Sequence, residues 1–305
     1  RSLLSFKEKS LYRYEDSSGN IMILDTSKYN MVDIDFDLLI KNEKNEDIKE
    51  IHRYFKNTKP TKKNDYTGIF KDKNVIFIMG ESFSSISINE ELTPTLYKIY
   101  NSGFKFNNFY TPLFPVSTSD GQYLTDTSLI PIEGKYSMSE SHNKYLPYSY
   151  GNVFSNLGYK TYAYHNYDYD YYDRNLYFNA TGFSNYLGCG NGLEDRIDCN
   201  IKFSSDYEMV KHTINDYVND DKFFTYYVTM SGHMNYDDSN NNVVKNWDKV
   251  KDLLYSDSAK GYLATQIELD KALEEMIRVL KENDRLEDTV IVLVGDHNPY
   301  GLSEE

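Results

Sequence analysis

The chain has 305 residues, a formal net charge of −14 and an isoelectric point near 4.9. This balance excludes nucleic-acid binding through a basic groove, and an anionic substrate would need a local positive centre such as a metal. No apolar run approaches the roughly 20 residues that span a bilayer. The chain does not begin with Met, so we interpret it as a trimmed or processed fragment.

The first 68 residues are predicted to form an arm and linker before the main domain. Alternating apolar and polar residues over Met31–Ile40 favour a strand, and the pattern over Asp47–Phe55 favours a helix. The polar stretch 59–65 then leads into a domain predicted for residues 69–305.

The predicted domain alternates strands with helices, which indicates an α/β fold with a central, mostly parallel sheet flanked by helices. The expected strands are Val75–Met79, Phe104–Tyr110, Lys160–Tyr164, Phe223–Thr229 and Thr289–Val294. The expected helices are Pro94–Asn101, Ser119–Thr127, Tyr150–Asn156, Ser204–Tyr217 and Ser258–Glu282.

Four predicted strands lead directly into polar residues that can carry chemistry. Glu81, His165 and His233 follow three of the strands, and Asp296 with His297 follows the last. Because ligands in open α/β sheets bind at the carboxyl ends of the strands, these side chains are expected to form one site.

Carboxylates and imidazoles are ligands for divalent cations, so Glu81, Asp296 and His297 predict a metal site. Gly80 and Gly295 precede these ligands and allow tight backbone turns. Taken alone, Glu81 also fits a solvated carboxylate at the end of a strand. The adjacent Asp296 and His297 after a buried strand are the more specific signal.

Thr118 lies near the start of a predicted helix, where free backbone N–H groups and the helix dipole favour negative charge. Its hydroxyl could attack phosphorus if a metal promoted its deprotonation. Serine and threonine also commonly cap helices, so this stretch alone leaves both interpretations open.

Cys189 and Cys199 enclose a short loop. A disulfide between them would fit a location outside the cytoplasm, whereas two buried thiols are the alternative. Their spacing does not match a CxxC metal or redox site.

Several motifs, in order along the chain, resemble the lipoteichoic acid synthase family within the alkaline phosphatase and sulfatase superfamily. The resemblance begins near Asn74 and continues to the end of the chain. Its markers are residues 74–83, Thr93-Pro94, Phe109-Tyr110, residues 117–120, residues 127–129, His165, residues 173–175, residues 223–233 and residues 295–297.

The resemblance implies a membrane-anchored enzyme whose catalytic domain lies on the outer face of the cell membrane. Such an enzyme moves glycerol phosphate from phosphatidylglycerol to a growing polyglycerol phosphate chain or a glycolipid anchor. Thr118 is then the nucleophile, and a Mn²⁺-type ion, with Mg²⁺ or Zn²⁺ as alternatives, is coordinated by four residues. These are Glu81, Thr118, Asp296 and His297.

His165, Arg174 and His233 match family residues that bind the glycerol phosphate, and Tyr172 stands where the family usually has Trp. Each of the two histidines also fits a structural role, and the arginine also fits a surface ion pair. Tyr167 replaces an acidic residue of the family. The family's domain continues beyond Gly-Asp-His, so a carboxyl-terminal part of the fold is expected to be missing.

Three other functions compete with this interpretation. A sulfatase proper needs Cys or Ser in a Cys/Ser-x-Pro-x-Arg setting, and neither that Pro nor that Arg surrounds Thr118. A phosphoethanolamine transferase uses the same threonine chemistry on another head group. The third alternative is a catalytically silent relative that acts as a scaffold. The intact set of four proposed metal ligands argues against it.

Overall fold

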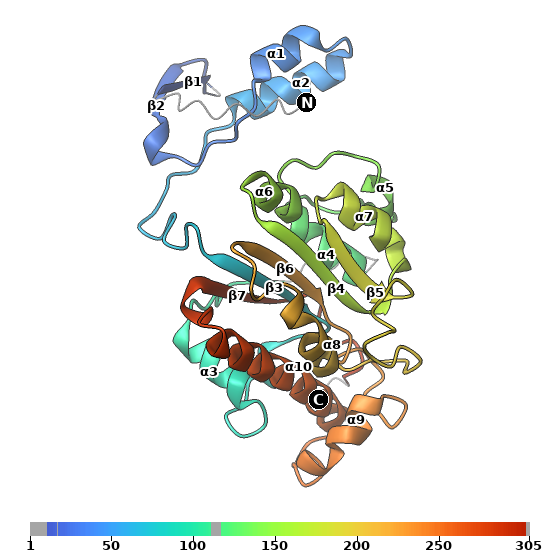
Figure 1. Cartoon of the computed structure of the whole chain (residues 1–305). Coiled ribbons are helices and arrows are strands. Elements are labelled where there is room, and N and C mark those ends of the chain that lie inside the picture. Colours follow the sequence, from blue (N-terminus) through green and yellow to red (C-terminus); the bar gives the residue numbers. More distant parts are fainter. Residues whose placement is uncertain (1–10, 17, 111–116, 303–305) are drawn as a thin grey trace. The chain divides into compact units, whose positions relative to one another are not determined.

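The computed structural model describes residues 11–16, 18–110 and 117–302. The chain divides into two compact units, Arg1–Lys71 and Asp72–Glu305. Each unit is described by itself (Figure 1). The assignment of the first 68 residues as an arm and linker stays a prediction.

The first unit pairs a β-hairpin with two helices. Strands β1 (Leu11–Glu15) and β2 (Ile21–Asp25) are antiparallel, and helices α1 (Phe36–Asn42) and α2 (Glu46–Asn57) follow. The helix predicted over Asp47–Phe55 is confirmed as α2. The predicted strand over 31–40 is wrong, because the Asp35 side chain accepts a hydrogen bond from the Leu38 N–H and starts α1 within that range.

The second unit is built on a parallel sheet of five strands in the order β5-β4-β6-β3-β7 (Figure 1). This confirms the predicted fold class. The strands are β3 (Asn74–Gly80), β4 (Lys160–Asp168), β5 (Asn185–Cys189), β6 (Phe223–Val228) and β7 (Thr289–Gly295).

The predicted strand Phe104–Tyr110 is wrong, and β5, which was not predicted, lies at the edge of the sheet instead. The 104–110 segment is rich in aromatic residues that favour strands, but Phe106 is 78% exposed. Aromatic residues favour a strand when the sheet surface buries them, and here it does not.

Helices cover both faces of the sheet (Figure 1). Helices α3, α8 and α10 pack on one face, α4 to α7 pack on the other, and α9 lies against α10. Their bounds are α3 (Pro94–Ser102), α4 (Ser117–Thr127), α5 (Ser137–Ser141), α6 (Tyr150–Asn156), α7 (Arg174–Ala180), α8 (Asp206–Thr213), α9 (Asn241–Asn246) and α10 (Asp257–Glu282). Short 3₁₀ helices occupy 26–28, 85–87, 171–173, 214–216, 247–249 and 286–288.

All five helices predicted for the 69–305 domain are present, although α8 begins and ends inside its predicted range. Side chains alternate between the two faces of the sheet along β3, so this strand contributes to the core on both faces. Ile76 and Ile78 pack with the α10 side of the core, whereas Phe77 and Met79 pack with the α4–α7 side.

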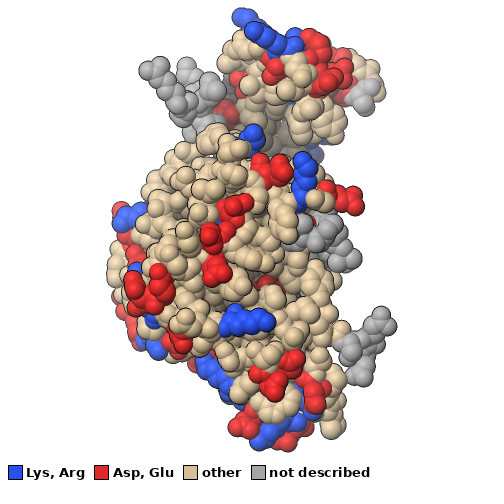
Figure 2. All heavy atoms as spheres, turned by 90° about the vertical axis from the view of Figure 1, so that its right-hand side faces the viewer, with Lys and Arg blue, Asp and Glu red and all other residues tan. Residues whose placement is uncertain are grey.

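Cys189 and Cys199 form a disulfide at the carboxyl end of β5, with their Cα atoms 5.8 Å apart. This selects the disulfide over the two thiols. Among the described helices, none combines the length and the apolar character needed to cross a bilayer. On the face drawn in Figure 2, acidic and basic side chains are interspersed between large uncharged areas.

Candidate functional site

The strand ends that carry the predicted site residues lie level with one another. Gly80 of β3 is paired with Gly295 of β7, so the following Glu81 and Asp296 start from neighbouring positions. His165 lies inside β4, which continues to Asp168 rather than ending at residue 164. Its pairing with Val228, the last residue of β6, still places it at the same edge of the sheet.

Glu81, Asp296 and His297 form a buried triad at this edge. The His297 Nε2 atom is 3.4 Å from Glu81 Oε1 and 3.4 Å from Asp296 Oδ2. One donor atom from each residue lies within 4.8 Å of the others. The His297 Nδ1–H donates to the Asn298 carbonyl at 2.8 Å, which leaves Nε2 free to bind a cation.

Ser82 holds the two carboxylates in place and was not anticipated from the sequence. Its N–H donates to Asp296 Oδ1 at 2.8 Å, and its hydroxyl donates to Glu81 Oε1 at 2.8 Å. The residue adopts a left-handed φ of 54°, a conformation that is costly for serine and is found at functional sites. Its place directly after Gly80-Glu81 was the signal available in the sequence.

The triad has the charge and the donors that suit a divalent cation. Burial raises the pKa of Glu81 well above its ordinary value, and the neighbouring Asp296 carboxylate raises it further. Asp296 Oδ2 is buried without a hydrogen-bond partner among the described residues. Two buried carboxylates beside an imidazole nitrogen form a donor set that Mn²⁺, Mg²⁺ or Zn²⁺ can use.

Thr118, the second residue of α4, directs its hydroxyl at this triad. Its Oγ1 atom is 3.4 Å from Glu81 Oε2 and 3.3 Å from His297 Nε2. Gly121 makes this approach possible, because a Cβ atom there would lie 2.4 Å from the Asp296 carbonyl oxygen. The predicted neighbourhood of Thr118, Glu81, Asp296 and His297 is therefore present in the structure.

Arg174 begins α7 and is buried beside α4. Its Nε–H donates to Gln122 Oε1 at 2.9 Å, and Gln122 lies one helical turn after Thr118. The guanidinium lies 5.2 Å from the centre of the Tyr172 ring, a cation–π contact. Burial lowers the pKa of Arg174 from its ordinary value. Tyr172 and Asp173 both have left-handed φ values, of 62° and 56°, just before this arginine.

The two predicted substrate histidines are held by backbone carbonyls. His165 is buried, and its Nδ1–H donates to the Val228 carbonyl at 3.0 Å. Burial lowers its pKa well below the ordinary value, and the Arg174 charge adds to this effect, so the imidazole is neutral. His233 is half-buried and stacks on Phe203 at 5.2 Å, and burial lowers its pKa as well.

The sulfatase family model matches residues 73–303, which include every residue of this site. The chain belongs to the sulfatase family.

Two of the proteins that this chain is similar to are lipoteichoic acid synthases. The enzyme of Staphylococcus saprophyticus is 29% identical over 279 residues, which cover 85% of this chain and 41% of that protein. The crystal structure of LtaP from Listeria monocytogenes is 28% identical, with a TM-score of 0.65 over 77% of this chain and 58% of that one. The resemblance inferred from the motifs is thereby confirmed, although the chain spans about two fifths of the first relative's length.

An alkaline phosphatase superfamily protein from Vibrio parahaemolyticus has a TM-score of 0.58 over 76% of this chain and 57% of that one. At 17% identity it shows the fold alone. Together with the family match, it confirms the predicted superfamily fold.

Proposed function

We propose that this chain is the catalytic domain of a metal-dependent phosphotransferase with Thr118 as its nucleophile. Its donor substrate is phosphatidylglycerol, and its acceptor is a polyglycerol phosphate chain or a glycolipid anchor. The proposal rests foremost on the Thr118 hydroxyl, which lies within 3.4 Å of both Glu81 and His297. The lipoteichoic acid synthases among the similar proteins support the choice of head group.

In the first half-reaction, Thr118 gives up its hydroxyl proton and its oxygen bonds to the phosphorus of the lipid. The bond between phosphorus and the diacylglycerol oxygen breaks, and diacylglycerol leaves with a proton. Position two of α4 favours this chemistry, because the N–H groups of a first helical turn stabilise a developing negative charge.

In the second half-reaction, a hydroxyl of the acceptor loses its proton and bonds to phosphorus. The bond between phosphorus and the Thr118 oxygen then breaks, and the threonine regains a proton. The polymer is one glycerol phosphate longer, and the threonine is ready for another donor.

Glu81, Asp296 and His297, together with the Thr118 oxygen, would hold the divalent cation. When bound, the cation supplies positive charge that lowers the pKa of a nearby hydroxyl and attracts the phosphate. Mn²⁺ is the proposed ion, and Mg²⁺ and Zn²⁺ are the alternatives.

Arg174 would bind the phosphate, and His165 and His233 would hydrogen-bond the phosphate or move protons. The guanidinium fork matches phosphate oxygens, and its bond to Gln122 fixes it to the helix that carries Thr118. The neutral His165 keeps its Nε2 available, because Nδ1 is occupied by the Val228 carbonyl. Tyr172 would form a wall of the same pocket through its contact with Arg174.

We further propose that the domain acts at the outer face of the membrane, where its lipid substrate is found. The Cys189–Cys199 disulfide supports this location, since disulfides persist in oxidising compartments.

The test uses vesicles that contain phosphatidylglycerol, with Mn²⁺ in the buffer, and measures the release of diacylglycerol. Thr118→Ala should lower the rate by roughly a thousandfold or more, whereas Thr118→Ser keeps a hydroxyl and should retain part of the activity. Unchanged release by Thr118→Ala would contradict the assignment of the nucleophile. Mass analysis of the Thr118 peptide, after exposure to vesicles that contain both phosphatidylglycerol and phosphatidylethanolamine, then distinguishes a glycerol phosphate adduct from a phosphoethanolamine adduct.

A further inference from the structure

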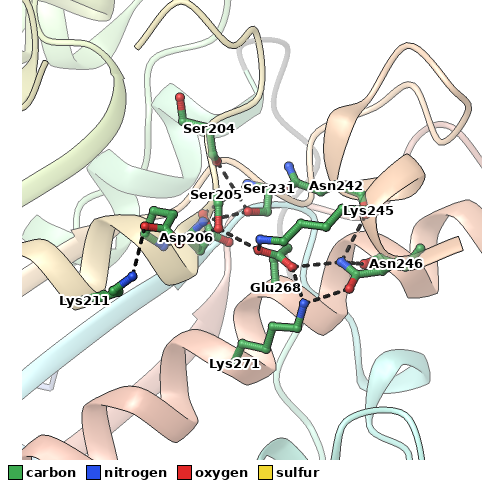
Figure 3. A network of polar contacts seen from close by, with 12 residues as sticks. Ser204, Ser205, Asp206, Lys211, Ser231, Asn242, Lys245, Asn246, Glu268 and Lys271 are labelled. Carbon is green, nitrogen blue, oxygen red and sulfur yellow. Dashed lines mark hydrogen bonds and ion pairs between the residues drawn. The ribbon is translucent and has the colours of Figure 1, made fainter. Parts of the chain in front are cut away.

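The segment 203–206, directly before and at the start of α8, contacts the ends of both β4 and β6. Asp206 is the last residue of this segment and the first of α8, and it is buried. Figure 3 shows Ser205 and Asp206 beside Ser231, with Glu268 of α10 close by. None of these residues belongs to the triad or to the predicted phosphate-binding set.

One oxygen of Asp206 joins the two strand ends. Its Oδ1 atom accepts hydrogen bonds from the Met230 N–H at 2.8 Å, the Ser231 N–H at 3.1 Å and the Asn166 side-chain amide at 3.0 Å. The Asp206 N–H in turn donates to Ser231 Oγ at 2.8 Å. A buried oxygen with three donors fixes the groups that donate to it, because each donor would be costly to leave unpaired.

The bonded groups are adjacent to the two proposed substrate histidines. Asn166 follows His165 on β4, and Met230 begins the turn that His233 closes by donating its N–H to the Met230 carbonyl at 3.1 Å. Phe203 of the same segment stacks on the His233 ring at 5.2 Å with an interplanar angle of 19°. The segment therefore contacts the backbone beside both histidines and the ring of one.

The segment is itself fixed to α10 by contacts around the buried carboxylate of Glu268 (Figure 3). Ser205 donates its hydroxyl to Glu268 Oε2 at 2.6 Å. Glu268 is buried and receives Lys245 at 2.8 Å and Lys271 at 2.7 Å. Asp206 is thus attached to a rigid element on one side and to the two strand ends on the other.

We propose that Asp206 is a positioning residue for substrate binding, which sets His165 and His233 at the geometry that a glycerol phosphate group requires. This inference rests on the function proposed above. Asp206 acts through Asn166 and through the turn that starts at Met230, and it does not itself touch the substrate.

The experiment compares the affinity of the Mn²⁺-loaded chain for glycerol phosphate in three variants. Asp206→Ala removes the shared acceptor and should weaken binding about tenfold or more, since small displacements of site groups have effects of this order. Asp206→Asn keeps an Oδ1 acceptor and should remain within about threefold of wild type by the same reasoning. Asp270→Ala is the matched control, because Asp270 is also buried and accepts from a backbone N–H, that of Leu96.

A second readout is independent of activity. The imidazole NMR signals of His165 and His233 should shift in Asp206→Ala and stay in place in Asp270→Ala. If wild type binds no glycerol phosphate while these signals still shift, the proposed substrate is wrong and the positioning role stands. Unmoved histidine signals, or equal losses of affinity in the Asp206 and Asp270 alanine variants, would overturn the role. If Asp206→Ala does not fold, Asn166→Ala tests the His165 link alone, with the same two outcomes for that histidine.

Discussion

Replacing Gly121 by alanine should separate the proposed nucleophile, Thr118, from the triad without removing any polar group. Gly121 lies on α4, one turn after Thr118, and an added Cβ would be 2.4 Å from the Asp296 carbonyl oxygen. The same Cβ would lie 3.1 Å from both the carbonyl carbon and the Cα atom of Asp296. The backbone of α4 fixes the position of this Cβ, and all three neighbouring atoms belong to the backbone of Asp296. The rotation of a side chain therefore cannot relieve the contact.

The size of the displacement follows from the contact distance. A carbon and a carbonyl oxygen in contact lie roughly 3.3 Å apart, so α4 and Asp296 must separate by about 0.9 Å. Thr118 is 3.3 Å from His297 and 3.4 Å from Glu81, at the outer limit of hydrogen bonding, and such a shift would break both contacts. A misplacement of about 1 Å at a reacting group costs on the order of a hundredfold in rate. Overpacking should also lower stability by about 1–3 kcal/mol.

The assay is diacylglycerol release from phosphatidylglycerol vesicles, at a temperature where thermal denaturation shows each variant to be folded. Gly151→Ala provides the matched control. Gly151 lies in α6, which carries no site residue, and its Cβ would lie 2.5 Å from the carbonyl oxygen of Thr181, at the end of α7 opposite to Arg174. Both variants should lose comparable stability, and the hundredfold loss in rate should occur in Gly121→Ala alone. Full activity in a folded Gly121→Ala protein would refute the argument that this contact positions Thr118.

Three further predictions concern charge. Mn²⁺ should raise the melting temperature of wild type and not that of Asp296→Asn, measured by calorimetry with and without chelator, because a cation that binds the folded state stabilises it. Burial raises the pKa of Asp126 from 3.8 to about 7. The contribution of this group to folding stability is therefore fully present below pH 4 and is lost as the pH rises through 7. Denaturant titrations should therefore find Asp126→Asn more stable than wild type above pH 7, by up to roughly 4 kcal/mol. Burial opposes ionisation of Glu268, but Lys245 and Lys271 lower its pKa to about 2. Glu268→Gln should thus destabilise the protein near pH 7 by roughly 3 kcal/mol, and the difference should shrink as the pH falls from 5 towards 2.

The sheet was predictable because β3, β6 and β7 appear as continuous apolar runs, of which β3 and β6 are buried on both faces. Four of its five strands were anticipated, whereas β5 (Asn185–Cys189) was not. That strand is short, lies at an edge and contains Asn and Gly, so its pattern carries little signal of its own. For the segment 104–110 the opposite error occurred, because a strand was predicted where none forms. The segment has strand-forming aromatic residues but no sheet surface to bury them.

The site was predictable as far as strand ends specify it. Residues that follow parallel strands meet at one edge, so Glu81, Asp296 and His297 could be brought together before any coordinates. The supporting contacts could not be found in this way. Ser82 acts through a left-handed backbone conformation, and Asp206 acts through three bonds to groups that are 24 to 40 positions away in the sequence. Such contacts depend on tertiary packing rather than on local pattern.

The net charge of −14 first implied that an anionic substrate would need a local positive centre. The structure contains one such centre among its own side chains, the buried Arg174, which Gln122 links to the helix of Thr118. A cation at the triad would be a second centre, in contact with the same threonine. Because α4 contacts both, a phosphate at Thr118 would be held between two positive charges that share one rigid helix. The acidic character of the rest of the protein then does not oppose binding, since charges separated by more than about 10 Å in salt solution are largely screened.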